Sequence, residues 1–272
     1  MRARVVGWVL LPLASIGLLL LAWELVVVVF HVQPYIAPRP LAAIQAVIDK
    51  WGVLWPLVLG ILRETVFGFA GGAVLGFLFA VAMSKVRVVR RLLYPQLILS
   101  QAVPVIALAF PLTAMLGFDS VRPIIAIVIW IVFFPVTVNV LDGLAHVDQD
   151  LLNLAKVYGA SRWRTFFQIE VPATISPLFT GLKIGATYAI TGSFIGESVS
   201  ASSSGSIALT ISQANGNNEE GLVYGLTLLL AAIGVAFFLA VVGVEALSTP
   251  WLRRTTSRPW RRRRLATSGA DQ

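Results

Sequence analysis

The chain has 272 residues, of which 57% are hydrophobic and only 12% are charged; soluble domains carry about 25% charged residues, so this composition excludes an ordinary water-soluble protein. The net charge of +8 could suggest a nucleic-acid partner, but the basic residues lie in short runs beside apolar blocks without interleaved aromatic residues, which favours contact with a lipid bilayer. The absence of cysteine excludes disulfides and thiolate metal sites, and His31 and His146 are too far apart in sequence to suggest a metal site.

Six apolar segments are long enough to cross a membrane, so the sequence predicts an all-α, polytopic membrane protein of about six transmembrane helices. The first segment, near residues 5–30, is longer than the apolar core of a secretory signal peptide and lacks a clear cleavage site. We therefore interpret residues 1–30 as a retained N-terminal transmembrane helix. The other five helices are expected near residues 65–84, 92–116, 123–141, 172–197 and 222–246.

Residues 31–64 are predicted to form an external loop and interfacial segment rather than a further span. Three prolines before residue 41 indicate a loop. Trp51 and Trp55 are typical of side chains that lie at the membrane surface.

Small residues recur at every fourth position in the second and fifth predicted helices. Such rows let two helices approach closely in a membrane, so we interpret them as packing seams; a solute path lined by small residues is the alternative. A row with this spacing drifts around a helix of 3.6 residues per turn, so the two ends of the fifth-helix row should face different neighbours. The rows are Gly68, Gly72, Gly76, Ala80 and Ser84, and Gly181, Gly185, Ala189 and Ser193.

Charged residues and prolines within the predicted helices are candidates for a translocation path or gate. Lys183 needs a partner, water or a route to the interface, and it is either structural or part of the path. Glu197 is either a gate or binding-protein contact, or a solvated carboxylate at a helix end. Pro104 and Pro111 in the third helix and Pro135 in the fourth predict kinks, which serve either gating or packing. The candidate path residues are Gln101, Pro104, Lys183, Ser193 and Glu197.

Lysine and arginine are distributed unevenly between the two sides of the predicted bundle. By the positive-inside rule the richer side is cytoplasmic, which places both termini in the cytoplasm. Residues 248–272 then form a basic cytoplasmic tail facing the anionic inner leaflet. The richer side carries Arg2, Arg4, Lys85, Arg87, Arg90, Arg91, Lys156, Arg162, Arg164 and the arginines between residues 253 and 264, and the other side carries Arg39, Lys50, Arg63 and Arg122.

The longest cytoplasmic loop, residues 142–171, combines an amphipathic stretch with a glycine and leads into the next helix at a proline. Gly159 permits a sharp turn or helix end, and Pro172 can start the following helix at little cost. An apolar face suits a groove on a partner, although a plain connector is the alternative. That face comprises Leu151, Leu152, Leu154 and Ala155.

The spacing in this loop resembles the motif of permease subunits of ATP-binding cassette (ABC) importers, written EAA, three residues, G, nine residues, I, any residue, L, P. The motif spans residues 153–172 of this chain. Ala155, Gly159, Ile169 and Pro172 match it, Val171 is a mild substitution, and Asn153 and Leu154 depart from it. The missing acidic residue at position 153 weakens any expectation of a salt bridge there.

The resemblance extends over about residues 61–247 and is closest to permeases of the nitrate, sulfonate and taurine type. Residues 159–163 and 196–198 look like that group. Residues 100–107 and 213–215 are similar to permeases for riboflavin or for hydroxymethylpyrimidine, a thiamine precursor.

This resemblance implies a type I ABC importer permease fold, with residues 65–247 as the transmembrane core, in the cytoplasmic membrane of a prokaryote. It implies two permeases, two cytoplasmic ABC ATPases and an extracytoplasmic binding protein. The chain has no internal repeat, so we expect a second copy to complete the pore. The implied coupling residues are Asn153, Leu154, Ala155, Gly159, Ala160, Ile169 and Pro172.

The chain has no G-x-x-x-x-G-K-[ST] loop, so we expect that it is not an enzyme and binds no cofactor, and that ATP and magnesium belong to the partner ATPase. A self-powered secondary transporter is the alternative from another class. Such a transporter is expected to show inverted repeats, which we do not find in the sequence.

Overall fold

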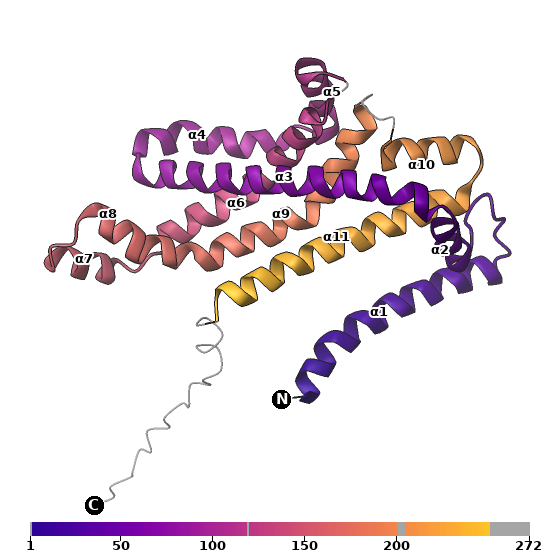
Figure 1. Cartoon of the computed structure of the whole chain (residues 1–272). Coiled ribbons are helices and arrows are strands. Elements are labelled where there is room, and N and C mark those ends of the chain that lie inside the picture. Colours follow the sequence, from indigo (N-terminus) through magenta and orange to yellow (C-terminus); the bar gives the residue numbers. More distant parts are fainter. Residues whose placement is uncertain (1, 119, 201–204, 251–272) are drawn as a thin grey trace, which may run out of the picture.

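The computed structural model describes residues 2–118, 120–200 and 205–250, and the side chains from residue 14 onward (Figure 1). The described residues form helices and no strand, which confirms the predicted all-α class. The elements are α1 (Arg2–Val29), α2 (Pro40–Asp49), α3 (Trp51–Lys85), α4 (Arg87–Leu99), η1 (Ser100–Ala102), α5 (Val105–Leu116), α6 (Arg122–Ala145), α7 (Gln149–Val157), α8 (Arg162–Thr165), η2 (Phe166–Glu170), α9 (Val171–Val199), α10 (Ile207–Gly216) and α11 (Glu220–Ser248).

In the described part of the chain, α3, α6 and α11 are long and apolar enough to cross a membrane, and α4 with η1 and α5 makes a fourth span if the bent pair is counted once. The 29-residue α9 is also long enough, but its threonines, its serines and two charged residues lower its hydropathy. α1 is apolar over Ala14–Val29. Each of the six predicted positions is therefore largely helical, although fewer of them meet the criteria of length and hydropathy together.

The second half of residues 31–64 belongs to α3, so the second predicted helix begins earlier than expected. α3 is a continuous helix of 35 residues that begins at Trp51, not near residue 65. The prolines mark a shorter non-helical stretch than expected, because Pro40 occupies the first turn of α2, where a missing N–H group costs little. Trp51 and Trp55 lie one turn apart on α3, with ring centroids separated by 5.6 Å.

The third predicted span is broken rather than merely kinked. α4 and η1 meet α5 at an angle of 104°. The break lies at Val103, which is extended (φ −80°, ψ 120°) because the ring of a following proline disfavours helical backbone. Pro104 is consequently the N-cap of α5 and not an interior residue, whereas Pro111 and Pro135 lie inside helices as predicted.

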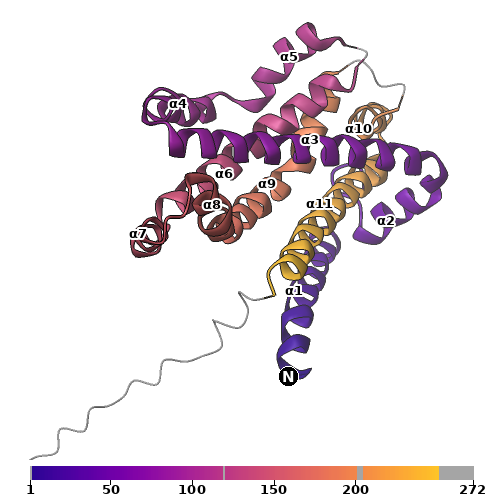
Figure 2. The same cartoon turned by 60° about the vertical axis from the view of Figure 1, so that its left-hand side comes forward.

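Glycines on α3 bring that helix against α6, and both helices run side by side with α9 through the bundle (Figures 1 and 2). A Cβ atom added at Gly68 would lie 2.4 Å from the Cβ of Val128, and one at Gly72 would lie 2.8 Å from the Cβ of Val132. Gly76 has the same relation to Val136. The predicted packing seam is therefore confirmed for the glycines of this row.

The row on α9 also packs against neighbouring helices, and its two ends diverge as predicted. A Cβ at Gly181 would lie 2.7 Å from the carbonyl oxygen of Pro135 on α6. Ser193, at the other end, is fully buried and shares a hydrogen bond of 2.8 Å with Thr65 of α3.

α11 and α1 are attached less tightly to this three-helix core. α11 packs on α2, where a Cβ at Gly225 would meet the carbonyl oxygen of Ala43, and on α9. α1 runs apart from α3, α6 and α9 in both views (Figures 1 and 2). An ion pair of 3.1 Å between Glu24 and Arg39 holds the end of α1 near α2.

Candidate functional site

An arm formed by α7, α8 and η2 extends from one end of the bundle (Figure 1). Side chains within the arm itself cap the N-termini of its helices α7 and α8. The Asp148 carboxylate accepts a hydrogen bond of 2.8 Å from the N–H of Asp150 and caps α7. The Ser161 hydroxyl accepts one of 3.3 Å from the N–H of Arg164 and caps α8. Residues 142–171 are therefore mostly helical and not an irregular loop.

Gly159 forms the turn between these two helices. Its φ of +70° lies in the left-handed region, where a side chain is strained. Its N–H donates to the carbonyl of Lys156 at 3.0 Å, and the N–H of Ala160 donates to that of Ala155 at 2.9 Å, which closes the end of α7. The helix end predicted at this glycine is confirmed.

The predicted apolar face of α7 divides into two parts. Leu152 and Ala155 are half-buried, whereas Leu151 and Leu154 are about half exposed. Sequence reasoning missed the most exposed apolar residues of the arm, although they flank the glycine it identified. These residues are Val157, Tyr158 and Trp163, with exposed fractions of 83%, 82% and 73%.

The remaining predicted coupling residues lie along the same arm. Asn153 is exposed, whereas Ala160 and Ile169 are half-buried. Pro172 is exposed in the first turn of α9, as predicted, although α8 and η2 lead directly into that helix.

An ion pair joins the arm to the end of α3. Lys85, the last residue of α3, bonds to the carboxylate of Glu170 in η2. The same ammonium group lies 5.0 Å from the ring centroid of Phe166, within range of a cation–π interaction. The Glu170 side chain is mostly buried, so this contact fixes the arm more firmly than a fully exposed pair would.

Three of the predicted path residues make contacts between helices. Lys183 bonds to both carboxylate oxygens of Glu245 on α11, at 2.9 and 3.1 Å. It therefore has the oppositely charged partner that lowers the cost of placing a charge inside a membrane. Glu197 is 5% exposed and accepts a hydrogen bond of 3.0 Å from the N–H of Ala208 at the start of α10. The solvated interpretation of Glu197 is therefore wrong, because a helix N-terminus provides its partner. Ser193 is the buried partner of Thr65.

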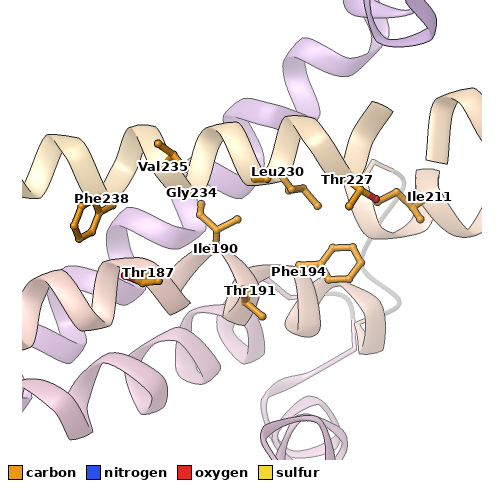
Figure 3. Close-up of a pocket in the computed structure, with 11 residues that line it drawn as sticks. Thr187, Ile190, Thr191, Phe194, Ile211, Thr227, Leu230, Gly234, Val235 and Phe238 are labelled. Atoms are coloured by element: carbon orange, nitrogen blue, oxygen red, sulfur yellow. The ribbon is translucent and has the colours of Figure 1, made fainter. Parts of the chain in front are cut away.

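The exposed side of α9 borders two grooves. The first lies between α9 and α11 and has a volume of about 590 Å³ (Figure 3). Thr187, Thr191 and Thr227 are its polar residues. Figure 3 shows Ile190 of α9 directed toward Gly234 of α11 across this groove.

The second groove has a volume of about 490 Å³ and is lined by α6, α9 and the region around the break between η1 and α5. Thr191 lines both grooves. Of the candidate path residues, Gln101 lines the second groove. Pro104 is exposed at the break and is not among the lining residues. None of the described residues that line either groove is charged.

Within the described residues, no group of three or more His, Asp and Glu side chains could hold a metal ion. The arrangement consists instead of an exposed apolar arm, an ion-paired joint to the bundle, and two uncharged grooves along one helix.

Comparisons with known proteins identify related chains. Residues 72–254 match the family described as "Binding-protein-dependent transport system inner membrane component". The chain is 30% identical to the formylaminopyrimidine transport permease protein ThiX of Halalkalibacterium halodurans, over 87% of this chain and 94% of the relative. It is 28% identical to the riboflavin transport system permease protein RibX of Chloroflexus aurantiacus, over 87% and 88%. It is 24% identical to the taurine transport system permease protein TauC of Escherichia coli, over 89% and 90%.

Proposed function

Because the chain belongs to the family of binding-protein-dependent transport system inner membrane components, we propose that it forms the transmembrane path for a small solute delivered by an extracytoplasmic binding protein. It is a permease subunit of an ABC importer and not the ATPase. Family membership argues against the self-powered secondary transporter that the sequence left open. ATP hydrolysis, with its magnesium, belongs to partner subunits in this proposal.

The exposed apolar arm is the observation that carries the coupling part of the proposal. Large exposed apolar patches mark contact surfaces, and this patch lies on both sides of the turn that Gly159 forms between α7 and α8. Lys85 and Glu170 connect the arm to α3, and η2 connects it to α9. Closure of the ATPases against the arm would therefore reach the helices that border both grooves.

The test uses proteoliposomes that contain the whole complex, with ATP hydrolysis and solute uptake measured together. Gly159→Val should strain the turn by about 1 kcal/mol or more and should lower uptake while the complex still folds. Leu154→Asp should weaken copurification of the ATPase, because an unpaired charge in a buried contact is costly. Gln168→Glu adds the same charge at an exposed position of η2 and serves as the control.

Full uptake and full ATPase association in both variants would show that the arm is only a connector. If Gln168→Glu also loses uptake and ATPase association, then any added negative charge on the arm is harmful. That outcome would remove the argument that the apolar face around Leu154 binds the ATPase.

The proposal also specifies a homodimer whose copies have both termini in the cytoplasm. The uneven distribution of lysine and arginine supports this orientation, and Lys85, Lys156 and Arg162 border one pocket beside the arm. A cysteine at position 270 should resist an impermeant thiol reagent in intact cells, while one at position 218 should react. The reverse pattern would overturn the orientation.

For the solute we propose a small heterocyclic vitamin or vitamin precursor, such as riboflavin or a thiamine-precursor pyrimidine. The likenesses at residues 100–107 and 213–215 support it, as does the greater identity to the formylaminopyrimidine and riboflavin permeases than to the taurine permease. The alternative is the same importer for sulfonate, taurine or nitrate. Binding assays on the cognate extracytoplasmic protein decide between them: tight binding of taurine with none of riboflavin or hydroxymethylpyrimidine would favour the alternative.

A further inference from the structure

The groove between α6, α9 and the break after η1 combines aromatic and neutral polar side chains. Its volume of about 490 Å³ falls within the range of small-molecule sites. Aromatic rings come from Trp130 and Phe134 on α6 and Tyr188 on α9. The polar residues are Gln101, Asn139 and Thr191, and the rest of the lining is aliphatic or proline.

Several polar atoms in this groove are available to a ligand. Asn139 donates from Nδ2 to the carbonyl of Pro135 at 2.7 Å, which orients its amide group. Among the described residues, no group donates to Asn139 Oδ1 or to Gln101 Oε1. The Thr187 hydroxyl bonds to the carbonyl four residues earlier in α9, whereas that of Thr191 makes no such bond in the described part of the chain. The groove therefore offers acceptors from two amides and a hydroxyl that can donate.

The lining disfavours anionic solutes. No described lining residue is charged, and the lysine on α9 is paired with Glu245 of α11. A sulfonate or nitrate group in the groove would lose hydration without gaining a counter-charge, which is costly. A neutral planar ring would gain aromatic contact and hydrogen bonds to its edge.

We propose that this groove is a contact site for an uncharged, planar nitrogen heterocycle passing through the permease. Trp130 and Tyr188 supply aromatic contact, and Asn139, Gln101 and Thr191 bond to the edge of the ring. The inference rests on the proposed function and locates its solute selectivity partly in the permease rather than wholly in the binding protein.

The test measures equilibrium binding of radiolabelled riboflavin, hydroxymethylpyrimidine and taurine to the complex of permease and ATPase in nanodiscs, without the binding protein. One of the two heterocycles should bind, and taurine should not. Tyr188→Ala and Asn139→Leu should each weaken that binding by about tenfold, as the loss of one good contact with a ligand does. Thr191→Val, which keeps the side-chain shape, should weaken it by a few-fold.

Thr227→Val in the other groove is the matched control and should bind the heterocycle as the unaltered complex does. Gel filtration and ATPase stimulation by the loaded binding protein show that each variant is folded and assembled. Equal binding of taurine, no binding of either heterocycle, or unchanged binding in both Tyr188→Ala and Asn139→Leu would overturn the site. Loss of one permease copy from the Tyr188→Ala complex would show that a second copy fills the groove, and would also overturn it.

These outcomes are separable from the proposed function. If the unaltered complex imports a heterocycle with ATP and the groove variants leave both binding and the KM for uptake unchanged, the site is wrong and the importer assignment stands. If the unaltered complex imports no solute with ATP, the proposed function itself fails.

Discussion

The seam between α3, α6 and α9 and the arm formed by α7, α8 and η2 use side-chain size in opposite ways. In the seam, glycines occur where neighbouring helices touch, so that Gly72 leaves no room for even a methyl group beside Val132. On the arm, Tyr158 and Trp163 are large, apolar and mostly exposed. The seam is therefore complete within one chain, whereas the arm has a surface whose burial requires a partner.

The difference indicates which changes should affect folding and which should affect coupling. Substitutions in the seam should lower the free energy of unfolding, because lipid provides no hydrophobic force to hold poorly fitted helices together. Substitutions at the tip of the arm should leave that free energy nearly unchanged. Substitutions in the ion pair between α9 and α11, and in the ion pair of Lys85 with Glu170, should have intermediate effects.

Gly72→Ala should have the largest effect on stability. The new Cβ would lie 2.8 Å from the Cβ of Val132 and 2.9 Å from the carbonyl oxygen of Ile129, and the latter is backbone that cannot rotate away. We expect a loss of about 1–3 kcal/mol, measured by denaturant unfolding in detergent. Gly60→Ala is the control on the same helix, since nothing lies within 4 Å of its Cβ. Because alanine favours a helix over glycine, Gly60→Ala should lose no stability, and equal losses in the two variants would show that the close contact with α6 is not the cause.

Lys183→Met and Glu245→Met should each have a smaller but measurable effect. Each single change leaves a half-buried charge without its partner, and we expect a loss of about 1–2 kcal/mol, reduced by the partial exposure of the pair. The double variant should recover most of this loss, because two apolar side chains replace the pair. Unfolding measurements on all four proteins test this, and strictly additive losses would show that the pair does not stabilise the contact between α9 and α11.

Glu170→Gln should reduce stability by no more than about 1 kcal/mol, since Lys85 stays close to solvent and to the Phe166 ring. Its main effect should be on coupling, measured as solute imported per ATP hydrolysed in proteoliposomes. The exchange Lys85→Glu with Glu170→Lys is the control and should restore coupling. If the exchange fails while ATPase association is normal, the joint does not act through its ion pair.

Tyr158→Ser should have the smallest effect on unfolding, within about 0.5 kcal/mol, because the ring is mostly exposed in the isolated chain. Retention of the ATPase during copurification should nevertheless fall. An unfolding loss comparable to that of Gly72→Ala would show that the tip packs within the permease itself, and the contrast between the two regions would no longer hold.

Local patterns in the sequence predicted the features that depend on neighbouring residues. The glycine rows, the helix end at Gly159 and the apolar positions of the helices follow from spacing and backbone preference alone. The proline that follows Val103 also indicates the break locally. Because the apolar pattern continues on both sides of it, residues 92–116 were nevertheless predicted as one kinked helix.

Features that depend on distant residues were not predictable in the same way. Glu245 is 62 residues from Lys183, and the N-terminus of α10 that receives Glu197 is formed by residues outside the six predicted spans. The same holds for the arm: sequence shows which residues are apolar, but the packing of α7 toward the bundle decides that Leu152 is half-buried while Leu154 is exposed.

The short element η2 has a geometric consequence for the whole rod from Arg162 to Val199. It is a π turn, in which the N–H of Val171 bonds to the carbonyl of Phe166 five residues earlier, so it holds one residue more than an α-helical turn would. Each residue of an α-helix advances the screw by about 100°. Removing one residue between 166 and 170 would restore an unbroken α-helix and leave α7 and α8 in nearly the same direction, because the wider π turn makes about one full turn with one residue more; removing one residue from the α-helical part of the rod would instead rotate α7 and α8 by about that angle around the axis of α9. The π turn thus lets the chain hold one extra residue here without turning the arm.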